Sequence, residues 1–79
     1  TLAFTGLAQR TAGALLRHCD AQGEVSATHE AIAAEIGSAR EAVSRQLGAF
    51  AKEGLVQLAR GKISLLRRDA LARMGLDSL

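Results

Sequence analysis

Four side chains able to contact nucleic acid lie within the segment 38–47, and they are Arg40, Glu41, Ser44 and Arg45. Spacings of one, four and five residues place them on one side of a helix, whereas Val43 and Leu47 point away from them. An arginine can grip guanine with two hydrogen bonds, and a carboxylate can accept a hydrogen bond from cytosine. These residue types in this pattern predict a helix that reads base edges and holds phosphates.

Positive charge is concentrated on this segment and the one after it. The chain of 79 residues has a formal net charge of +2, which alone does not identify a nucleic-acid binder. Residues 1–37 have a net charge of −2, residues 38–62 one of +3 and the last seventeen one of +1. A cationic region around the expected reading helix favours an anionic partner. A solvated face of mixed charge is the alternative on charge alone.

Length and composition predict one small helical domain over residues 1–79. A chain of this length has a modest core, and sixteen of its apolar residues are alanines. The absence of proline fits a mainly helical chain with short turns. The single cysteine excludes an intrachain disulfide and gives no zinc-finger pattern, so a reducing, cytoplasmic location is the simplest expectation. No apolar stretch approaches the length of a membrane span, and we expect no membrane partner.

The first part of the chain predicts a helix, a brief strand and a second helix. Apolar residues recur at three- and four-residue spacing over about 5–20, with Thr5 as the expected N-cap. Residues 24–27 read as a brief strand after a glycine-bearing stop. Thr28 is the expected N-cap of the second helix, and Gly37 is expected to end it.

A third helix is predicted over 38–53, directly after a tight turn. Ser38, the first residue of this helix, fits an S-x-x-E capping box with Glu41. Gly54 fits a Schellman-type stop at the other end. Its expected buried stripe is Val43, Leu47, Phe50 and Ala51. Two helices joined by a glycine-bearing turn over about 28–53 predict a helix-turn-helix.

The hydrophobic period changes to that of strands after the third helix. Residues 55–58 and 63–66 read as two strands, which predicts a hairpin, or wing, over about 55–66. The turn between them carries Arg60 and Lys62, and Asp69 is the expected cap of a last short helix over about 69–74, ended by Gly75. This order predicts a winged helix-turn-helix, a mainly α fold with a small β-hairpin wing (α+β).

The motifs resemble those of a known family. The run Arg40-Glu41-Ala42-Val43-Ser44-Arg45 resembles the RETVSR recognition helix of the Crp/Fnr bacterial transcription regulators. Residues 28–37 resemble the first helix of that family's helix-turn-helix, residues 52–56 its entry to the wing, and residues 60–63 its wing turn. The resemblance covers nearly the whole chain. It implies a C-terminal winged helix-turn-helix domain that binds DNA.

The resemblance also implies roles for individual residues. The family's base-reading positions fall on Arg40, Glu41 and Arg45, and Thr28 matches its phosphate-contacting helix cap. The side chains that we further expect to contact phosphate are Ser38, Ser44, Lys52, Arg60 and Lys62. Alanines at 39 and 42 replace the hydroxyl residues that are usual in the family, which predicts a slightly weaker grip on phosphate.

The resemblance sets expectations for partners as well. The family's domain follows an effector-sensing β-roll and a long dimerisation helix, and we expect both to lie outside these 79 residues. We therefore expect no cofactor in this chain, and the effector of the missing domain is unknown. The implied partners are double-stranded DNA with a palindromic operator, a second copy in a homodimer of the full-length protein, and RNA polymerase.

Other readings of the same residues stay open. Glu41 and Arg45 could form an ion pair on an exposed helix, and cations at the hairpin tip could protect an exposed strand edge. A winged helix used for protein contact is the alternative function. No nucleophile–base pair or phosphate-cradling glycine loop supports an enzyme. Structural roles, not metal binding, are expected for His18, Cys19, Asp20 and His29.

Overall fold

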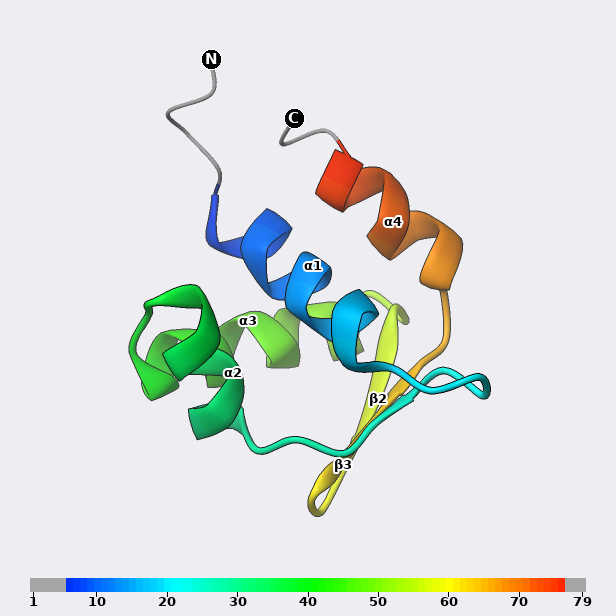
Figure 1. The fold of residues 1–79 in the computed structure, drawn as a ribbon. Coiled ribbons are helices and arrows are strands. Elements are labelled where there is room, and N and C mark those ends of the chain that lie inside the picture. Colours follow the sequence, from blue (N-terminus) through cyan, green and yellow to red (C-terminus); the bar gives the residue numbers. More distant parts are fainter. Residues whose placement is uncertain (1–5, 77–79) are drawn as a thin grey trace.

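Residues 6–76, which the computed structural model describes, form four helices and three strands. In chain order these are α1 (Leu7–His18), β1 (Glu24–Val25), α2 (His29–Ile36), α3 (Arg40–Lys52), β2 (Val56–Ala59), β3 (Lys62–Leu65) and α4 (Arg68–Leu76). Helix α1 lies in the centre, with α4 on one side of it and α2 and α3 on the other, and the β2–β3 hairpin extends away from the helices (Figure 1). The arrangement confirms the predicted winged helix-turn-helix.

The three strands form one antiparallel sheet in the order β1-β3-β2. The predicted hairpin strands are each displaced by one residue, because Ala59 pairs with Lys62. That pairing leaves Arg60 and Gly61 alone in the turn. Gly61 has a φ of 71°, which a residue without a Cβ adopts easily. The brief strand predicted after the first helix is confirmed, and it adds an edge to the hairpin.

A single apolar core joins all of these elements. Each helix and strand contributes at least one of its largest fully buried side chains, which include Phe50, Leu15, Ile32, Leu47, Ile63, Leu71, Val25, Val43 and Val56. Complete burial of a side chain of this size stabilises the folded state by about 1.5–3 kcal/mol. Helix α3 supplies three of these side chains, so its orientation against the core is fixed by packing.

The capping box predicted at the start of the third helix is wrong. Helix α3 begins at Arg40 with Ala39 as its N-cap, and no side chain within the described residues caps it. Ser38 instead belongs to the turn, where its backbone N–H donates to the Ala33 carbonyl at 2.9 Å. That bond closes the end of α2, whose C-cap Gly37 has a left-handed φ of 70°. The turn geometry therefore takes Ser38 away from the capping position.

The predicted Schellman end of α3 is confirmed. The backbone N–H of Leu55 donates to the carbonyl of Phe50 at 2.9 Å, and that of Gly54 donates to Ala51 at 3.1 Å. Gly54 has a φ of 78°, as this motif requires. The reversal sends the chain directly into β2, so only Glu53, Gly54 and Leu55 separate α3 from the hairpin.

Other helix ends agree only in part with the prediction. Thr28 caps α2 as expected. Helix α1 starts at Leu7 with Gly6 as its N-cap and ends at His18, and Thr5 lies outside the described residues. Helix α4 starts one residue earlier than predicted, so Asp69 lies in its first turn rather than at its cap, and α4 continues through Gly75.

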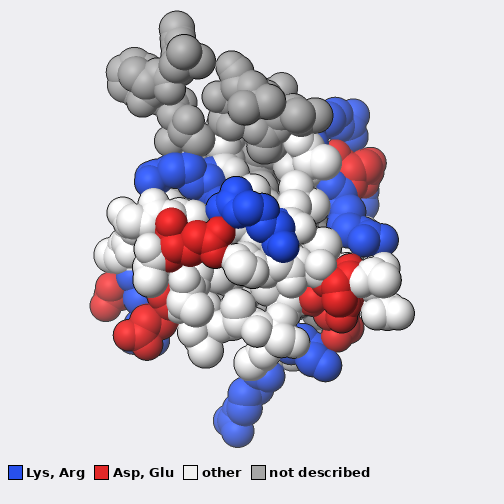
Figure 2. Space-filling model, viewed as in Figure 1, with Lys and Arg blue, Asp and Glu red and all other residues white. Residues whose placement is uncertain are grey.

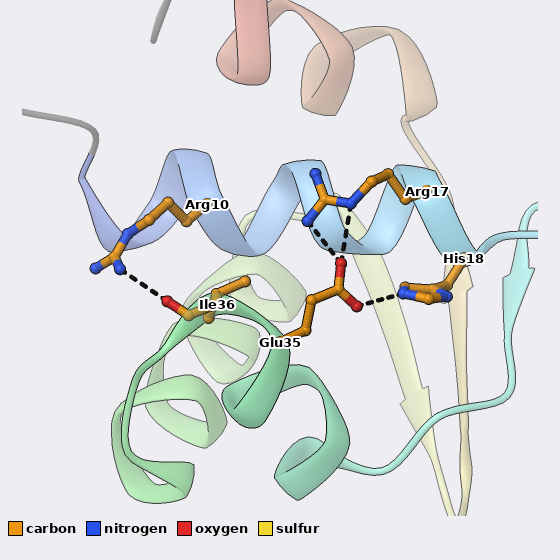
Figure 3. A network of polar contacts seen from close by, with 5 residues as sticks. All are labelled: Arg10, Arg17, His18, Glu35 and Ile36. Carbon is orange, nitrogen blue, oxygen red and sulfur yellow. Dashed lines mark hydrogen bonds and ion pairs between the residues drawn. The ribbon is translucent and has the colours of Figure 1, made fainter. Parts of the chain in front are cut away.

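Polar contacts join α1 to the C-terminal half of α2 (Figure 3). Arg17 donates two hydrogen bonds to one carboxylate oxygen of Glu35, at 2.7 and 2.9 Å, and the ring of His18 contacts the other oxygen. The guanidinium of Arg10 donates to the backbone carbonyl of Ile36 at 2.9 Å. Its partner is one of the carbonyls that a helix end leaves without an intrahelical bond. The helix-turn-helix is therefore held against α1 at three points.

Two glycine substitutions, one within α3 and one just after its C-cap, should change stability in opposite directions. Gly48 lies within the helix with open space where a Cβ would be, so Gly48→Ala should stabilise the chain by about 0.5–1 kcal/mol. Gly54 also has open space, but its left-handed φ disfavours a Cβ, and Gly54→Ala should destabilise by about 1–2 kcal/mol. Urea unfolding of both variants measures the difference, and equal shifts would contradict the conformational explanation.

The Glu35 contacts predict an acid dependence of stability. Hydrogen bonds from Arg17, and then from His18, lower the pKa of Glu35 from its usual 4.5. A carboxyl group whose pKa is lower in the folded state stabilises the fold above its unfolded pKa, and the benefit disappears as the pH falls through the folded pKa. Wild type should therefore lose more unfolding free energy between pH 6 and pH 3 than Glu35→Gln does.

The matched control is Glu53→Gln, which removes an exposed carboxylate at the end of α3 without affecting the α1–α2 contacts. Urea unfolding at a series of pH values gives the comparison. A Glu35→Gln variant with the same pH slope as wild type would contradict the prediction.

Candidate nucleic-acid interface

The expected base-reading side chains lie on the outer face of α3. Arg40, Glu41 and Arg45 are all exposed, whereas Val43 and Leu47 on the opposite face are fully buried. The tight turn that contains Gly37 brings α2 across the start of α3, and the two helices are in contact. The local sequence thus determines which side of α3 faces outward.

These three side chains are available for a partner. Among the residues that the structure describes, none of them takes part in an ion pair or a side-chain hydrogen bond with the protein. The alternative of a stabilising pair between Glu41 and Arg45 therefore has no support in the structure. Two guanidinium groups and one carboxylate present their full hydrogen-bonding capacity to the outside.

A hollow of about 330 Å³ separates the start of α3 from the wing. Arg40 from α3 and Lys62 from β3 supply its positive charge, and Glu30 from α2 supplies one carboxylate. Its complete lining is Ala27, Thr28, His29, Glu30, Arg40, Ala59, Gly61, Lys62 and Ile63. The first turns of α2 and α3 and the hairpin tip thus surround one space, in which two cations can hold an anion.

Thr28 places a hydroxyl group at this hollow. Its Oγ1 accepts a hydrogen bond from the backbone N–H of Ala31 at 3.0 Å, and the side chain is exposed. The cap uses Thr28 as an acceptor, so its hydroxyl hydrogen remains able to donate to a phosphate oxygen. The positive end of the α2 dipole also favours an anion at this position.

Ser44 has a partner that sequence reasoning missed. Its Oγ lies 2.8 Å from Nδ1 of His29, the first residue of α2, and the contact is partly buried. The sequence predicts a structural role for His29 but gives no partner for it. Fifteen residues separate the pair, so only the packing of α2 across α3 reveals it. The contact places an imidazole between the outer face of α3 and the cationic hollow.

Lys62 also has a partner within the chain. Its Nζ lies 3.3 Å from Glu24 Oε1, although about half of the lysine side chain is exposed. Ser64 donates to the other oxygen of Glu24 at 3.3 Å, and these two residues are directly opposite in the β1–β3 ladder. The expected phosphate ligand at the wing is therefore partly neutralised by a carboxylate from β1.

The turn before β1 fixes Glu24 in place. The carboxylate of Asp20 accepts hydrogen bonds from the backbone N–H groups of Glu24 and Gln22, both at 2.9 Å. The bond from Glu24 is the main cause that lowers the pKa of Asp20 from its usual value. Glu24 therefore reaches Lys62 from an ordered position.

The other expected phosphate contacts are more widely spread. Arg60 is exposed in the hairpin turn, and Figure 2 shows basic side chains projecting from the tip of the hairpin at the bottom of the view. Lys52 is exposed at the last residue of α3, about 18 Å along the helix axis from Arg40. Ser38 is half-buried in the turn between α2 and α3. The structure thus brings Thr28, Arg40 and Lys62 together but leaves Lys52 apart.

Two further findings bear on the expectations from the sequence. Within the described part of the chain, no three His, Cys, Asp or Glu side chains are grouped in a way that could hold a metal ion. None of the helices in residues 6–76 is long and apolar enough to cross a membrane.

Comparison with known proteins identifies the same architecture elsewhere. Residues 9–74 match the family of Crp-like helix-turn-helix domains. The chain is 40% identical over 81 aligned positions to the transcriptional regulator SdrP of Thermus thermophilus. The alignment covers 92% of this chain and 40% of that relative, so the chain spans less than half of the relative's length.

Solved structures give the same result. A candidate transcriptional regulator of the Crp/Fnr family from Eubacterium rectale superposes with a TM-score of 0.89 at 38% identity, covering 95% of this chain and 36% of that one. A Crp/Fnr-family transcriptional regulator from Thermus thermophilus superposes with a TM-score of 0.86 at 35% identity, covering 95% and 43%.

Proposed function

Because this chain belongs to the family of Crp-like helix-turn-helix domains, we propose that it binds double-stranded DNA in a sequence-specific manner, with α3 in the major groove. The observation that carries the proposal is the outer face of α3, where Arg40, Glu41 and Arg45 are exposed and without a protein partner among the described residues. The role is one of binding and not of catalysis.

The arrangement supports separate roles for residues that contact bases and residues that contact the phosphate backbone. Arg40 and Arg45 can each donate two hydrogen bonds to a guanine, and Glu41 can accept one from a cytosine. Thr28 and Lys62 line the hollow beside Arg40 at the start of α3, and Arg60 is exposed in the hairpin turn. Contacts to the phosphate backbone set the register of the protein on the duplex without reading its sequence. Ser38, Ser44 and Lys52 complete the set of proposed phosphate contacts.

A single recognition helix reads only a few base pairs, so useful specificity needs two copies on a palindromic site. We therefore propose that the full-length protein binds its operator as a homodimer. The relatives that the chain matches are more than twice as long as the matched segment, which leaves room in them for a dimerising and sensing part. Contact with RNA polymerase rests on the family relationship alone.

A protein-contact module is the second candidate function. Leu58 and Leu66 are large apolar side chains that are exposed in the structure, at 37% and 53%. A salt titration separates the two candidates, because neutralisation of phosphates releases counterions and makes DNA binding weaken steeply with added salt. Weak salt dependence together with no retention of duplex DNA would favour the protein-contact function.

Substitutions of Arg40 and Lys62 should have different effects on specificity. Arg40→Ala should cost about 1–3 kcal/mol on a selected duplex and relax the preference at one base position. Lys62→Ala should weaken binding to selected and random duplexes alike and reduce the salt slope by about one. Fluorescence anisotropy with both duplexes at several salt concentrations gives the comparison. Equal losses on both duplexes for both variants would contradict the assignment.

Removal of the Glu24 carboxylate should tighten DNA binding. In Glu24→Gln the amide can still accept the hydrogen bond from Ser64, but Lys62 loses its ion pair and becomes fully available to phosphate. Exposed pairs contribute about 0.2–1 kcal/mol, so we expect a gain of about two- to fivefold on selected and random duplexes alike.

Two controls accompany this measurement. Asp69→Asn makes the same change of charge on α4, away from the wing, and should have a smaller effect. Glu24→Gln in a Lys62→Ala background should gain little, because the lysine that the carboxylate holds is absent. A gain of full size in that background would show that Glu24 acts by general repulsion and not through Lys62.

A further inference from the structure

The contact between His29 and Ser44 links the two sides of the candidate interface. Ser44 lies on α3 between Glu41 and Arg45, and its Oγ is 2.8 Å from His29 Nδ1. His29 also lines the cationic hollow. Ser44 is half-buried, so its hydroxyl has few other directions in which to point. The imidazole is therefore placed to determine what Ser44 can offer to a ligand.

The direction of this hydrogen bond changes the chemistry of Ser44. A serine hydroxyl has one hydrogen to donate and two lone pairs to accept with. When Nδ1 accepts that hydrogen, Ser44 presents only lone pairs, which a phosphate oxygen repels. When Nδ1 carries a hydrogen, the ring donates to Oγ, and the Ser44 hydrogen becomes free for a phosphate oxygen or a base acceptor. A doubly protonated ring allows only the second direction.

From this geometry we propose that His29 is a positioning residue that sets the direction of the Ser44 hydroxyl and thereby makes the Ser44–DNA contact dependent on pH. The inference rests on the proposed DNA binding. Imidazole side chains change charge between about pH 5 and pH 8. When the ring is doubly protonated it donates to Ser44, and Ser44 can donate to the backbone of the duplex.

Other charged groups share the same surroundings. Glu30 on α2, Arg40 on α3 and Lys62 on β3 face the hollow that His29 lines, and Arg45 follows Ser44 on α3. A protonated ring also adds a positive charge to this surface, which strengthens binding to any duplex whether or not Ser44 is present. The quantity that isolates the hydroxyl is therefore the loss caused by Ser44→Ala, compared between two pH values.

The experiment measures the affinity of the 79-residue chain for a duplex selected from a random pool by the wild-type chain. Anisotropy titrations at low salt compare wild type with Ser44→Ala at pH 5.5 and pH 8.0. Because a hydrogen bond to a charged group is typically strong, we expect Ser44→Ala to weaken binding about tenfold at pH 5.5 and only about twofold at pH 8.0. Circular dichroism at both pH values confirms that each chain is folded.

The same comparison in two His29 variants tests the coupling. In a His29→Ala background the effect of Ser44→Ala should be equal at both pH values. In a His29→Asn background an amide replaces Nδ1, so affinity should stay within about twofold of wild type at pH 8.0, and the Ser44→Ala effect should again be independent of pH. These two results, with the pH-dependent effect in wild type, support the inference.

Other outcomes overturn it. A Ser44→Ala effect that is the same at both pH values in the wild-type background shows that the ring does not control the hydroxyl. A pH-dependent effect that persists in His29→Ala assigns the dependence to another group. Should wild type retain no duplex at either pH value while remaining folded, the proposed DNA binding fails and takes this inference with it. If either of the first two outcomes occurs while wild type binds the duplex and loses affinity on Arg40→Ala, DNA binding stands and only the role of His29 is in error.

Discussion

Burial of Val43, Leu47 and Phe50 fixes the rotation of α3 about its own axis, and the rest of the candidate interface depends on that rotation. Successive residues of an α-helix are rotated by about 100°, so three buried side chains fix the direction of every other side chain on the same helix. Arg40, Glu41 and Arg45 point outward because the apolar face of α3 packs against the core. Burial of three large side chains stabilises the fold by several kcal/mol, whereas an exposed ion pair contributes at most about 1 kcal/mol. Packing, not electrostatics, therefore orients the charged face.

The wing is positioned by a second set of constraints. The Schellman end of α3 directs the chain into β2, and the ladder with β1 anchors β3 on its other side. Lys62 and Gly61 thereby come to line the same hollow as Arg40 and Thr28. The first turn of α2, the start of α3 and the hairpin each supply only a few residues to the hollow. Its geometry therefore depends on how the sheet and the helix ends are placed relative to one another.

Local patterns in the sequence were sufficient for most of the fold. The periodicity of α3, the Thr28 cap and the Gly54 stop all have local physical causes, and all three are confirmed. The predicted capping box is absent because the backbone N–H of Ser38 donates to the Ala33 carbonyl at the end of α2. Ser38 therefore lies in the turn and not at the N-cap of α3. The ladder between β1 and β3 and the pairs His29–Ser44 and Glu24–Lys62 join residues 15 to 40 positions apart. Such contacts follow from tertiary packing, on which a single sequence gives no pattern to read. The roles of the nine expected DNA-contacting residues remain predictions.

The contacts between α1 and α2 have a mechanical consequence. Exposed pairs such as Arg17–Glu35 add little energy, but the bond from Arg10 to the last turn of α2 is partly buried and charge-assisted. Thr11, Ala12, Ala14 and Leu15 of the same helix are buried beside it. The turn between α2 and α3 is therefore anchored to α1 through the last residue of α2, so the orientation of α3 depends on that contact as well as on its own buried face.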